Sequence, residues 1–356
     1  MGSQATKVAL LFGGRSGEHE VSVRSAVSVA EGLAPRHDVL PVLVDPAGRW
    51  WLQDSSTPAP EGGRPVFLAP HPGDGGALRL FPGGEVAARP DVYFPVLHGP
   101  YGEDGTVQGL LELAAVPYVG SGVAASAAGM DKELMKALFA AAGIPQTPHR
   151  VLRRADLPRA GGLAAELGLP LFVKPANLGS SVGVSKVKTA AELPAALDAA
   201  FAYDLKVVVE KGVDAREMEV SVLGNEDARA SLPGEILPDR EFYDYDSKYS
   251  AESRTELRIP APVDPATTQE IRDLGVRAFR AVDACGYARV DVLVERGSGR
   301  VLVNEINTIP GFTSISMFPK MWEATGLLYP DLLSRLVELG RERHAQRAAL
   351  RTNYSK

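Results

Sequence analysis

The chain has 356 residues, 38 of them lysine or arginine and 44 aspartate or glutamate, for a formal net charge of −6. This length predicts two or three domains, and the acidic balance without a basic cluster argues against nucleic-acid binding. The single cysteine, Cys285, excludes an internal disulfide and a thiolate zinc cluster. No apolar run approaches the roughly 18 residues of a membrane span, and no signal peptide is recognisable, so we expect a cytoplasmic protein without membrane contact.

Apolar runs alternate with helical patterns along the first part of the chain, which predicts α/β architecture. The expected strands are 7–12, 38–44 and 91–99, and the expected helices 20–33 and 104–115. The stretch 45–90 is rich in glycine and proline and contains weak strand-like pieces at 50–52, 66–68 and 78–81. We interpret this stretch as a decorated insertion.

The pattern of expected helices and strands changes after the Tyr-Val-Gly-Ser-Gly segment at 118–122. The expected helices are 131–142, 157–168, 190–202 and 264–284, and the expected strands 149–152, 171–176, 182–187, 206–211, 216–224 and 229–237. A polar stretch at 239–256 separates the last of these strands from the helix that Asp264 is expected to cap. A hairpin is expected from strands at 287–296 and 300–307, then closing helices and a frayed helix end after about 341.

The predicted hairpin carries the strongest chemical signal. Arg289 and Asp291 lie two residues apart on one strand, so their side chains share a face. Asn304, Glu305 and Asn307 follow on the partner strand. Carboxylate and amide oxygens suit Mg²⁺ bridging nucleotide phosphates, and Arg289 is suited to offset charge on a transferred phosphoryl group. A surface ladder of salt bridges is the alternative, but it does not explain the NTIPGF turn sequence that begins at Asn307.

A loop rich in glycine and serine follows the strand expected at 171–176. In KPANLGSSVGVSKV (174–187) a lysine ends a buried strand, and the backbone N–H groups and hydroxyls after it are suited to hold phosphates. The loop lacks the Gly-x4-Gly-Lys-Ser/Thr pattern of a Walker A motif. A simple hairpin turn is the alternative interpretation.

Isolated polar residues add weaker signals. Glu210 at a strand end is suited to accept from an adenine amino group, and Glu217 or Glu219 to bind ribose hydroxyls, although each alone is more simply a solvated charge. His98 ends a strand at the edge where open α/β sheets bind ligands, and Glu18 opens a helix after a glycine-containing turn. That turn lacks the full dinucleotide-binding pattern, so a dinucleotide site is not expected.

Eight colinear segments between about residues 7 and 335 resemble the D-alanine–D-alanine ligases of the ATP-grasp superfamily. The segments are FGGRSGEHEVSVRSA, HGPYGEDGTVQGLLELAAVPYVGSGV, MDKELMK, FVKPANLGSSVGVSKV, EKGVDAREMEVSVLG, FYDYDSKY, ARVDVL and NEINTIPGFTSIS.

The resemblance implies a three-domain ATP-grasp fold of the α/β class. Its expected parts are an N-terminal open α/β domain (1–122) that includes the 45–90 insertion, a central subdomain (123–212) and a C-terminal subdomain (213–356) with a mobile loop at 239–256. The nucleotide is then expected between the central and C-terminal domains.

The resemblance also assigns roles to individual residues. Its implied ATP contacts are Lys132, Phe172, Lys174, Ser180, Glu210, Lys211, Val213, Glu217, Phe242, Lys248, Asn304 and Glu305. Asp291, Glu305 and Asn307 match the ligands of two Mg²⁺ ions, for which Mn²⁺ is a possible substitute. Glu18, His98, Arg289, Gly311 and Ser316 match the sites of the two D-alanines. Ser180 and Tyr249 would join Glu18 in a hydrogen-bonded triad that holds the closed loop.

The implied reaction converts one D-alanine to an acyl phosphate, which the amine of the second D-alanine attacks to give D-alanyl-D-alanine for peptidoglycan synthesis. Arg289 and the Gly311 N–H are candidates to hold the oxyanion. The alternatives are a D-alanine–D-lactate or D-alanine–D-serine ligase and, from another class, a catalytically silent nucleotide-binding regulatory protein. Because Tyr249, Glu18 and Ser180 are all present, we predict D-alanine as second substrate, and the family suggests a homodimer.

Overall fold

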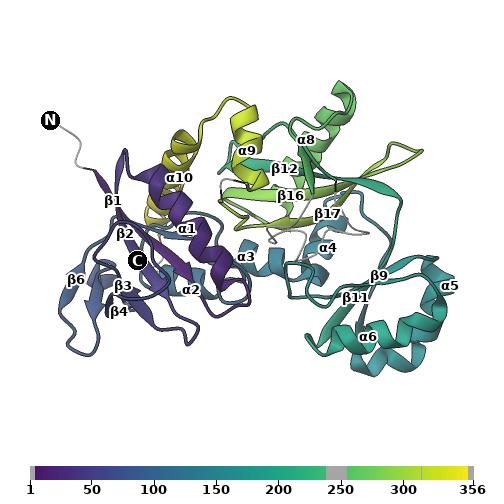
Figure 1. Ribbon diagram of the computed structural model, residues 1–356, viewed down its shortest axis with the longest axis horizontal. Coiled ribbons are helices and arrows are strands. Elements are labelled where there is room, and N and C mark those ends of the chain that lie inside the picture. The colour runs from purple at the N-terminus through teal and green to yellow at the C-terminus, as the bar shows by residue number, and fades with distance from the viewer. Residues whose placement is uncertain (1–4, 238–254, 314, 352–356) are drawn as a thin grey trace.

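The computed structural model describes residues 5–237, 255–313 and 315–351, which fold around three β-sheets (Figure 1). A seven-stranded sheet lies at one end of the molecule, and a four-stranded sheet lies at the other end beside a larger C-terminal sheet. This is the mixed α/β architecture expected from the sequence. No helix among the described residues combines the length and the apolar character that a membrane span requires.

The first sheet has the strand order β6-β5-β4-β3-β2-β1-β7. Its strands are β1 (Thr6–Gly13), β2 (His37–Val44), β3 (Trp50–Leu52), β4 (Arg64–Leu68), β5 (Leu78–Leu80), β6 (Val86–Ala88) and β7 (Val92–Pro95). Strands β2, β1 and β7 are parallel, and the remaining pairs are antiparallel. The stretch 45–90 therefore extends this sheet: its three predicted strands are present, and β6 is an additional one.

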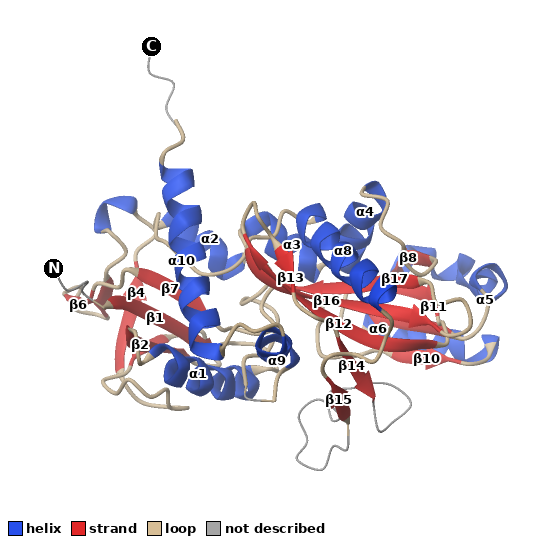
Figure 2. Cartoon of the chain, turned by 90° about the horizontal axis from the view of Figure 1, so that it is seen from above, coloured by secondary structure: helices blue, strands red, loops and turns tan. Residues whose placement is uncertain are grey.

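Helices of the first and last parts of the chain cover the two faces of this sheet. These helices are α1 (His19–Leu33), α2 (Thr106–Leu113) and α10 (Tyr329–Ala348), and α1 and α10 lie side by side (Figure 2). Helix α9 (Met317–Ala324) contacts α10 and β12 (Ala215–Gly224) of the third sheet. Phe12 of β1, Phe312 and Trp322 belong to one buried cluster. The N-terminal and C-terminal parts thus share a core, which fixes their relative positions.

The expected frayed end after residue 341 is wrong. Helix α10 continues to Ala348, and the Arg343 side chain is buried. Arg343 donates 2.8 Å hydrogen bonds to the Gly120 carbonyl and to Glu112, and it stacks 4.3 Å from the ring centroid of Tyr118. The end of α10 is therefore a packed helix, although its sequence is rich in charged residues.

The four-stranded sheet has the order β10-β9-β11-β8 and its own core. Its elements are β8 (His149–Arg153), β9 (Leu171–Pro175), β10 (Ser185–Val187), β11 (Lys206–Lys211), α5 (Leu163–Leu167), α6 (Leu193–Phe201) and the 3₁₀ helices η2 (Arg154–Gly162) and η3 (Ala190–Glu192). The helix predicted at 157–168 is 3₁₀ up to Gly162 and α-helical only from Leu163 to Leu167, since Pro158 and two glycines disfavour an α-helix in its first half. Helices α3 (Val123–Met130) and α4 (Lys132–Ala141) precede this sheet, and α3 was not predicted.

The third sheet has the order β15-β14-β12-β16-β17, and β13 pairs with β12. Its elements are β12 (Ala215–Gly224), β13 (Arg229–Ala230), β14 (Gly234–Leu237), β15 (Glu256–Arg258), β16 (Gly286–Glu295), β17 (Val301–Asn307) and helix α8 (Pro265–Ala281). The predicted hairpin is confirmed as β16 and β17, and Asp264 caps α8 by accepting from the backbone N–H groups of Ala266 and Thr267. The strand expected at 229–237 is divided in two at Pro233, which cannot donate to a ladder.

Candidate active site

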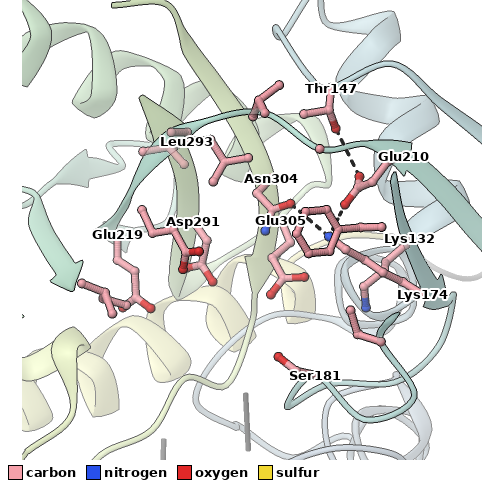
Figure 3. Close-up of a pocket in the computed structure, with 18 of the residues that line it drawn as sticks. Lys132, Thr147, Lys174, Ser181, Glu210, Glu219, Asp291, Leu293, Asn304 and Glu305 are labelled. Carbon is pink, nitrogen blue, oxygen red and sulfur yellow. Dashed lines mark hydrogen bonds and ion pairs between the residues drawn. The ribbon is translucent and has the colours of Figure 1, made fainter. Parts of the chain in front are cut away.

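A cleft of about 180 Å³ opens between the four-stranded sheet and the third sheet, and Figure 3 shows its charged lining. Every described member of the predicted ATP set lines this cleft: Lys132, Phe172, Lys174, Ser180, Glu210, Lys211, Val213, Glu217, Asn304 and Glu305. Asp291 of the predicted metal set lines it too. Residues more than 170 positions apart in the chain are thus brought to one site.

Strand alternation places the lining of the central side. In β9, Leu171 and Val173 enter the core of the four-stranded sheet, so Phe172 and Lys174 project from the opposite face. Glu210 of β11 pairs with Phe172, which puts its carboxylate diagonally beside the Lys174 side chain. The cross-strand pairing therefore explains why a lysine and a glutamate meet under the cleft.

The Glu210 carboxylate is almost completely buried and is held by two lysines. One oxygen forms an ion pair with Lys174, and the other lies 2.9 Å from the Lys136 ammonium and accepts a hydrogen bond from Thr147 at 3.2 Å. Burial acts to raise the pKa of Glu210, but Lys136 and Lys174 outweigh it and hold that pKa well below its usual range. Glu210 is therefore ionised at neutral pH.

Lys136 is a site residue that the sequence interpretation missed. A signal existed, because Lys132 and Lys136 are four residues apart in a predicted helix and so share a face. Asp131 caps this helix by accepting from the N–H groups of Glu133 and Leu134, which fixes the first turn that carries Lys132. The Lys132 ammonium donates a 2.7 Å hydrogen bond to the Leu178 carbonyl in the glycine- and serine-rich loop, and burial lowers its pKa.

Three carboxylates form a row across the third sheet on the other side of the cleft. Glu219 of β12 pairs with Asp291 of β16, which in turn pairs with Glu305 of β17. The register shifts after Asp291, so Asn304 is the extra residue of a β-bulge and reaches the cleft next to Glu305. A Lys174 hydrogen bond of 3.4 Å to the Asn304 side chain spans the cleft.

Arg289 neutralises part of this row. Its guanidinium makes a bidentate pair with Asp291, at 2.6 and 2.7 Å, and lies 3.2 Å from a Glu219 oxygen. Burial acts to lower the pKa of Arg289, but these two carboxylates raise it well above its ordinary value. The arginine is a fixed cation that faces the sheet's acidic residues.

The predicted metal ligands are not brought together equally. Asp291 and Glu305 are cross-strand neighbours in the cleft, whereas Asn307 pairs with Arg289 and its side-chain oxygen accepts from the Ile309 N–H at 2.9 Å. Within residues 5–237, 255–313 and 315–351, no three His, Cys, Asp or Glu side chains form a group suited to hold a metal ion by themselves. The oxygen donors present are hard ligands of the kind that Mg²⁺ prefers.

A second group of predicted residues lies where the N-terminal domain meets the loop of the central sheet. The Ser180 hydroxyl donates a hydrogen bond to Glu18, which immediately precedes α1. Ser180 has a φ of 51°, in the left-handed region that residues other than glycine seldom adopt. This contact ties the loop that lines the cleft to the N-terminal domain.

His98 and the segment after β17 complete this second group. His98 is 5% exposed; its Nδ1 lies 2.9 Å from the Ile309 carbonyl and its Nε2 lies 3.1 Å from the Ser25 hydroxyl. The carbonyl contact makes Nδ1 the protonated nitrogen, and burial lowers the His98 pKa. A Cβ on Gly311 would come within 2.8 Å of the Ser316 hydroxyl, so these two predicted residues are in close contact.

Glu103 is a second residue that the sequence interpretation missed. It is 8% exposed, one of its oxygens accepts a 2.8 Å hydrogen bond from the Gly99 N–H, and the other finds no hydrogen-bond partner in the described part of the chain. Burial, together with the negative charge of Glu18, raises the pKa of Glu103 to about 8. Glu103 is thus largely protonated at neutral pH, a property that its exposed-looking sequence, GPYGEDG, does not reveal.

Three predicted residues, Phe242, Lys248 and Tyr249, lie outside the described residues, as does nearly all of the predicted loop at 239–256. The roles assigned to them stay predictions. Of the triad that the resemblance implies, the structure describes Glu18 and Ser180 and brings them together.

Family models match most of the chain. The model described as D-ala D-ala ligase N-terminus matches residues 7–121, and the model described as D-ala D-ala ligase C-terminus matches residues 138–338. The cleft residues contributed by both later sheets fall inside the second match, and Glu18 and His98 inside the first.

Full-length relatives carry the same description. A D-alanine–D-alanine ligase of Heliobacterium modesticaldum is 51% identical over 96% of each chain, and a D-alanine–D-alanine ligase A of Bradyrhizobium diazoefficiens is 50% identical over 98% of each. The solved D-alanine–D-alanine ligase of Coxiella burnetii has a TM-score of 0.86, with 37% identity over 97% of both chains. The VanG D-Ala:D-Ser ligase of Enterococcus faecalis has a TM-score of 0.84, with 33% identity over 95% of this chain and all of its own.

Proposed function

The chain belongs to the D-alanine–D-alanine ligase family, and from this membership and the cleft we infer how its residues use ATP to join two D-alanine molecules. Enzymes of this family act on small molecules and depend on ATP. The observation that carries the proposal is the convergence of Lys132, Lys174 and Arg289 with Asp291 and Glu305 around one cleft. Cations beside acidic metal ligands are the arrangement that phosphoryl transfer requires.

In this proposal the cleft between the central and C-terminal sheets binds ATP. Lys132 and Lys174 face the phosphates, and Phe172 packs against the adenine. Lys211 and Val213 lie on the chain segment beside Glu210, where their backbone groups reach the adenine edge, and Glu217 binds the ribose. Supporting evidence is that all of these residues line the same cleft. The central subdomain is proposed to be 123–212 and the C-terminal subdomain 213–356, with the loop at 239–256, including Phe242 and Lys248, closing over the nucleotide.

We assign Asp291, Glu305 and Asn307 to two Mg²⁺ ions. The two carboxylates fit this role, because they are cross-strand neighbours that face the cleft, and Asn304 adds an amide oxygen beside them. Asn307 fits less directly, since its oxygen accepts from Ile309 in this structure. When bound, the ions would offset charge on the triphosphate, and Mn²⁺ offers the same octahedral oxygen coordination.

The first D-alanine is assigned to the group around Glu18 and His98. A carboxylate is a poor electrophile, so the carboxylate oxygen of the first D-alanine attacks the γ-phosphorus and ADP leaves. The product is an acyl phosphate. The neutral amine of the second D-alanine, held near Gly311 and Ser316, then attacks the acyl carbon, and inorganic phosphate leaves as the amide bond forms. Arg289 and the Gly311 N–H are assigned to hold the tetrahedral oxyanion.

The choice of second substrate is the finer part of the proposal. The similar Enterococcus structure is described as a D-Ala:D-Ser ligase, so D-serine is a specific competitor, and D-lactate is a further one. We propose D-alanine, because Glu18 and Ser180 are hydrogen bonded and Tyr249 is present to complete the triad. We further propose that the enzyme is a homodimer and acts in the cytoplasm, where ATP is available. A silent regulatory protein is disfavoured, because no predicted metal ligand or phosphate lysine is missing from the sequence.

The test incubates the purified chain with ATP, Mg²⁺ and D-alanine, measures phosphate release, and identifies the product by mass. D-Alanyl-D-alanine formed in step with phosphate is the expected result. Parallel reactions containing D-alanine with D-serine or D-lactate should still yield mainly the alanine dipeptide at neutral pH. A mixed dipeptide or an ester as the main product would contradict the assigned specificity, and no phosphate release with any of the three would contradict the proposed reaction.

A further inference from the structure

Lys136 is a buried lysine that none of the roles above uses. It lies on α4 with 1% of its surface exposed, and its ammonium is 2.9 Å from Glu210. A charged side chain this deeply buried is costly unless it is paired, and lysine is almost never found fully buried without a partner. An apolar residue of the same length would fill this volume without that cost, so the charge itself calls for an explanation.

The charge balance beneath the cleft explains why a lysine occupies this buried position. Lys136 and Lys174 contribute two positive charges, and Glu210 contributes one negative charge, so the three residues carry a net charge of +1. Without Lys136, the Glu210 carboxylate would neutralise Lys174 alone, and the trio would be neutral. The cleft above would then offer less positive charge to a polyphosphate.

Lys136 and Lys174 differ in their exposure to the cleft, and this difference implies different functions. The Lys174 side chain is 14% exposed and lines the cleft, where it reaches Asn304 on the opposite wall, whereas the Lys136 side chain is 2% exposed and does not line the cleft. Lys136 and Thr147 hold one Glu210 oxygen, and only the other oxygen faces Lys174. Lys136 thus acts on a ligand through Glu210 and not by contact.

We propose that Lys136 is a positioning residue for the nucleotide: it holds Glu210 from below and balances its charge, so that the three residues keep a net charge of +1 where Lys174 meets the phosphates. This inference rests on the proposed nucleotide role of the cleft. It identifies the ligand of this part of the cleft by its chemistry, a polyphosphate with at least two phosphate groups. A neutral nucleoside gains nothing from the arrangement.

The test compares ADP with adenosine, using calorimetric titration of the full chain. Lys136→Met should weaken ADP binding about tenfold, the scale of one partly screened charge, and leave adenosine binding unchanged. The double variant Lys136→Met/Glu210→Gln restores the net charge of +1, and its glutamine keeps an acceptor oxygen for adenine. Because Glu210 is itself assigned to the adenine side, the readout is the ratio of ADP affinity to adenosine affinity, which should return to within about twofold of the wild-type ratio.

Two further variants separate the possible failures. Lys320→Met removes a lysine of α9 that does not line the cleft, and it should bind both ligands like the wild type. Lys174→Met should weaken ADP binding; if it does not, the proposed nucleotide site is wrong. If Lys174→Met weakens ADP binding but Lys136→Met does not, only the inference about Lys136 fails.

The inference is also overturned if Lys136→Met weakens adenosine and ADP equally, which is the result of a distorted cleft. If the single variant does not fold, the double variant still decides, because it replaces the buried carboxylate that loses one of its two lysine partners in the single variant. A ratio of ADP affinity to adenosine affinity about tenfold below that of the wild type in a folded double variant would contradict the charge-balance explanation.

Discussion

The Ser180 hydroxyl donates a hydrogen bond to the carboxylate of Glu18, although 162 positions separate the two residues in the chain. Glu18 stands at the start of the first helix, and Ser180 belongs to the loop after β9 that lines the cleft. The contact therefore links the group assigned to the first D-alanine with the wall assigned to the phosphates. Through this hydrogen bond, binding of the first amino acid at Glu18 is coupled to the position of the loop that contains Ser180.

Breaking this link should impair catalysis. Ser180→Ala removes a hydrogen bond to a charged group, an interaction of about 1.5–3 kcal/mol, so kcat/KM for D-alanine should fall roughly 10- to 100-fold. Steady-state phosphate release checks this. Ser298→Ala is the matched control, because it removes a serine–glutamate hydrogen bond at the exposed β16–β17 turn. Equal values of kcat/KM in the two variants would show that the Ser180 contact has no part in turnover.

Metal removal should abolish the reaction. Recovery of activity on adding Mg²⁺ should depend on the assigned metal ligands. Chelation with EDTA is expected to stop phosphate release, and Mg²⁺ to restore it. Glu305→Gln removes one hard anionic ligand, so the half-saturating Mg²⁺ concentration should rise by at least about tenfold. A titration of activity against Mg²⁺ measures this.

The control for the metal site lies on the same hairpin. Glu295→Gln changes a glutamate at the end of β16 that contacts Arg300 and Ser298 instead of the cleft. Its Mg²⁺ requirement should equal that of the wild type. An unchanged Mg²⁺ requirement in Glu305→Gln would remove Glu305 from the metal site.

Local patterns predicted the parts of the fold and site that depend on short spacing. Strand alternation puts Asp291 on the face that carries Arg289, and Glu305 shares that face because it pairs with Asp291 across the hairpin. Asn304 was also named, although the bulge that turns it toward the cleft is not visible in the sequence. The order of the four antiparallel strands in 45–90 was not predicted either, because their pairing depends on contacts that periodicity does not encode.

Buried charges were the main failure of prediction. Lys136, Glu103 and Arg343 are charged residues of types that ordinarily face solvent. Lys136 and Arg343 are paired with residues distant in the chain, Glu210 and Glu112 respectively, whereas Glu103 accepts from the N–H of Gly99, four positions earlier. The two distant pairings depend on the tertiary structure, which local sequence patterns do not encode. The spacing of Lys132 and Lys136 gave the one local hint.

The raised pKa of Glu103, about 8, predicts a pH dependence of stability. An unfolded glutamate ionises near pH 4.5, whereas the folded one stays protonated until about pH 8, so the folded state binds the extra proton between these values. Stability is then fully present below about pH 4.5 and is lost as pH rises toward 8. Glu103→Gln, which cannot ionise, should lack this loss.

The measurement is urea unfolding of both proteins at pH 5 and pH 8. The difference in unfolding free energy, variant minus wild type, should become more positive at pH 8 by roughly 1 kcal/mol or more, since each unit of pKa shift corresponds to about 1.4 kcal/mol. Glu295→Gln, which changes a partly exposed glutamate, should show no such change between the two pH values. A constant difference for Glu103→Gln would mean that Glu103 is ionised in the folded protein.

The packed end of α10 makes a final prediction about stability. Arg343→Met removes the hydrogen bonds to Gly120 and Glu112 and the stacking on Tyr118. The expected loss is about 2–3 kcal/mol, because a buried carbonyl loses its donor, although Arg347 still pairs with Glu112. Arg335→Met, which breaks exposed pairs with Glu338 and Glu342 on the same helix, should cost less than about 1 kcal/mol. Urea unfolding compares the two, and equal losses would mean that this end of the helix adds no more stability than its exposed surface.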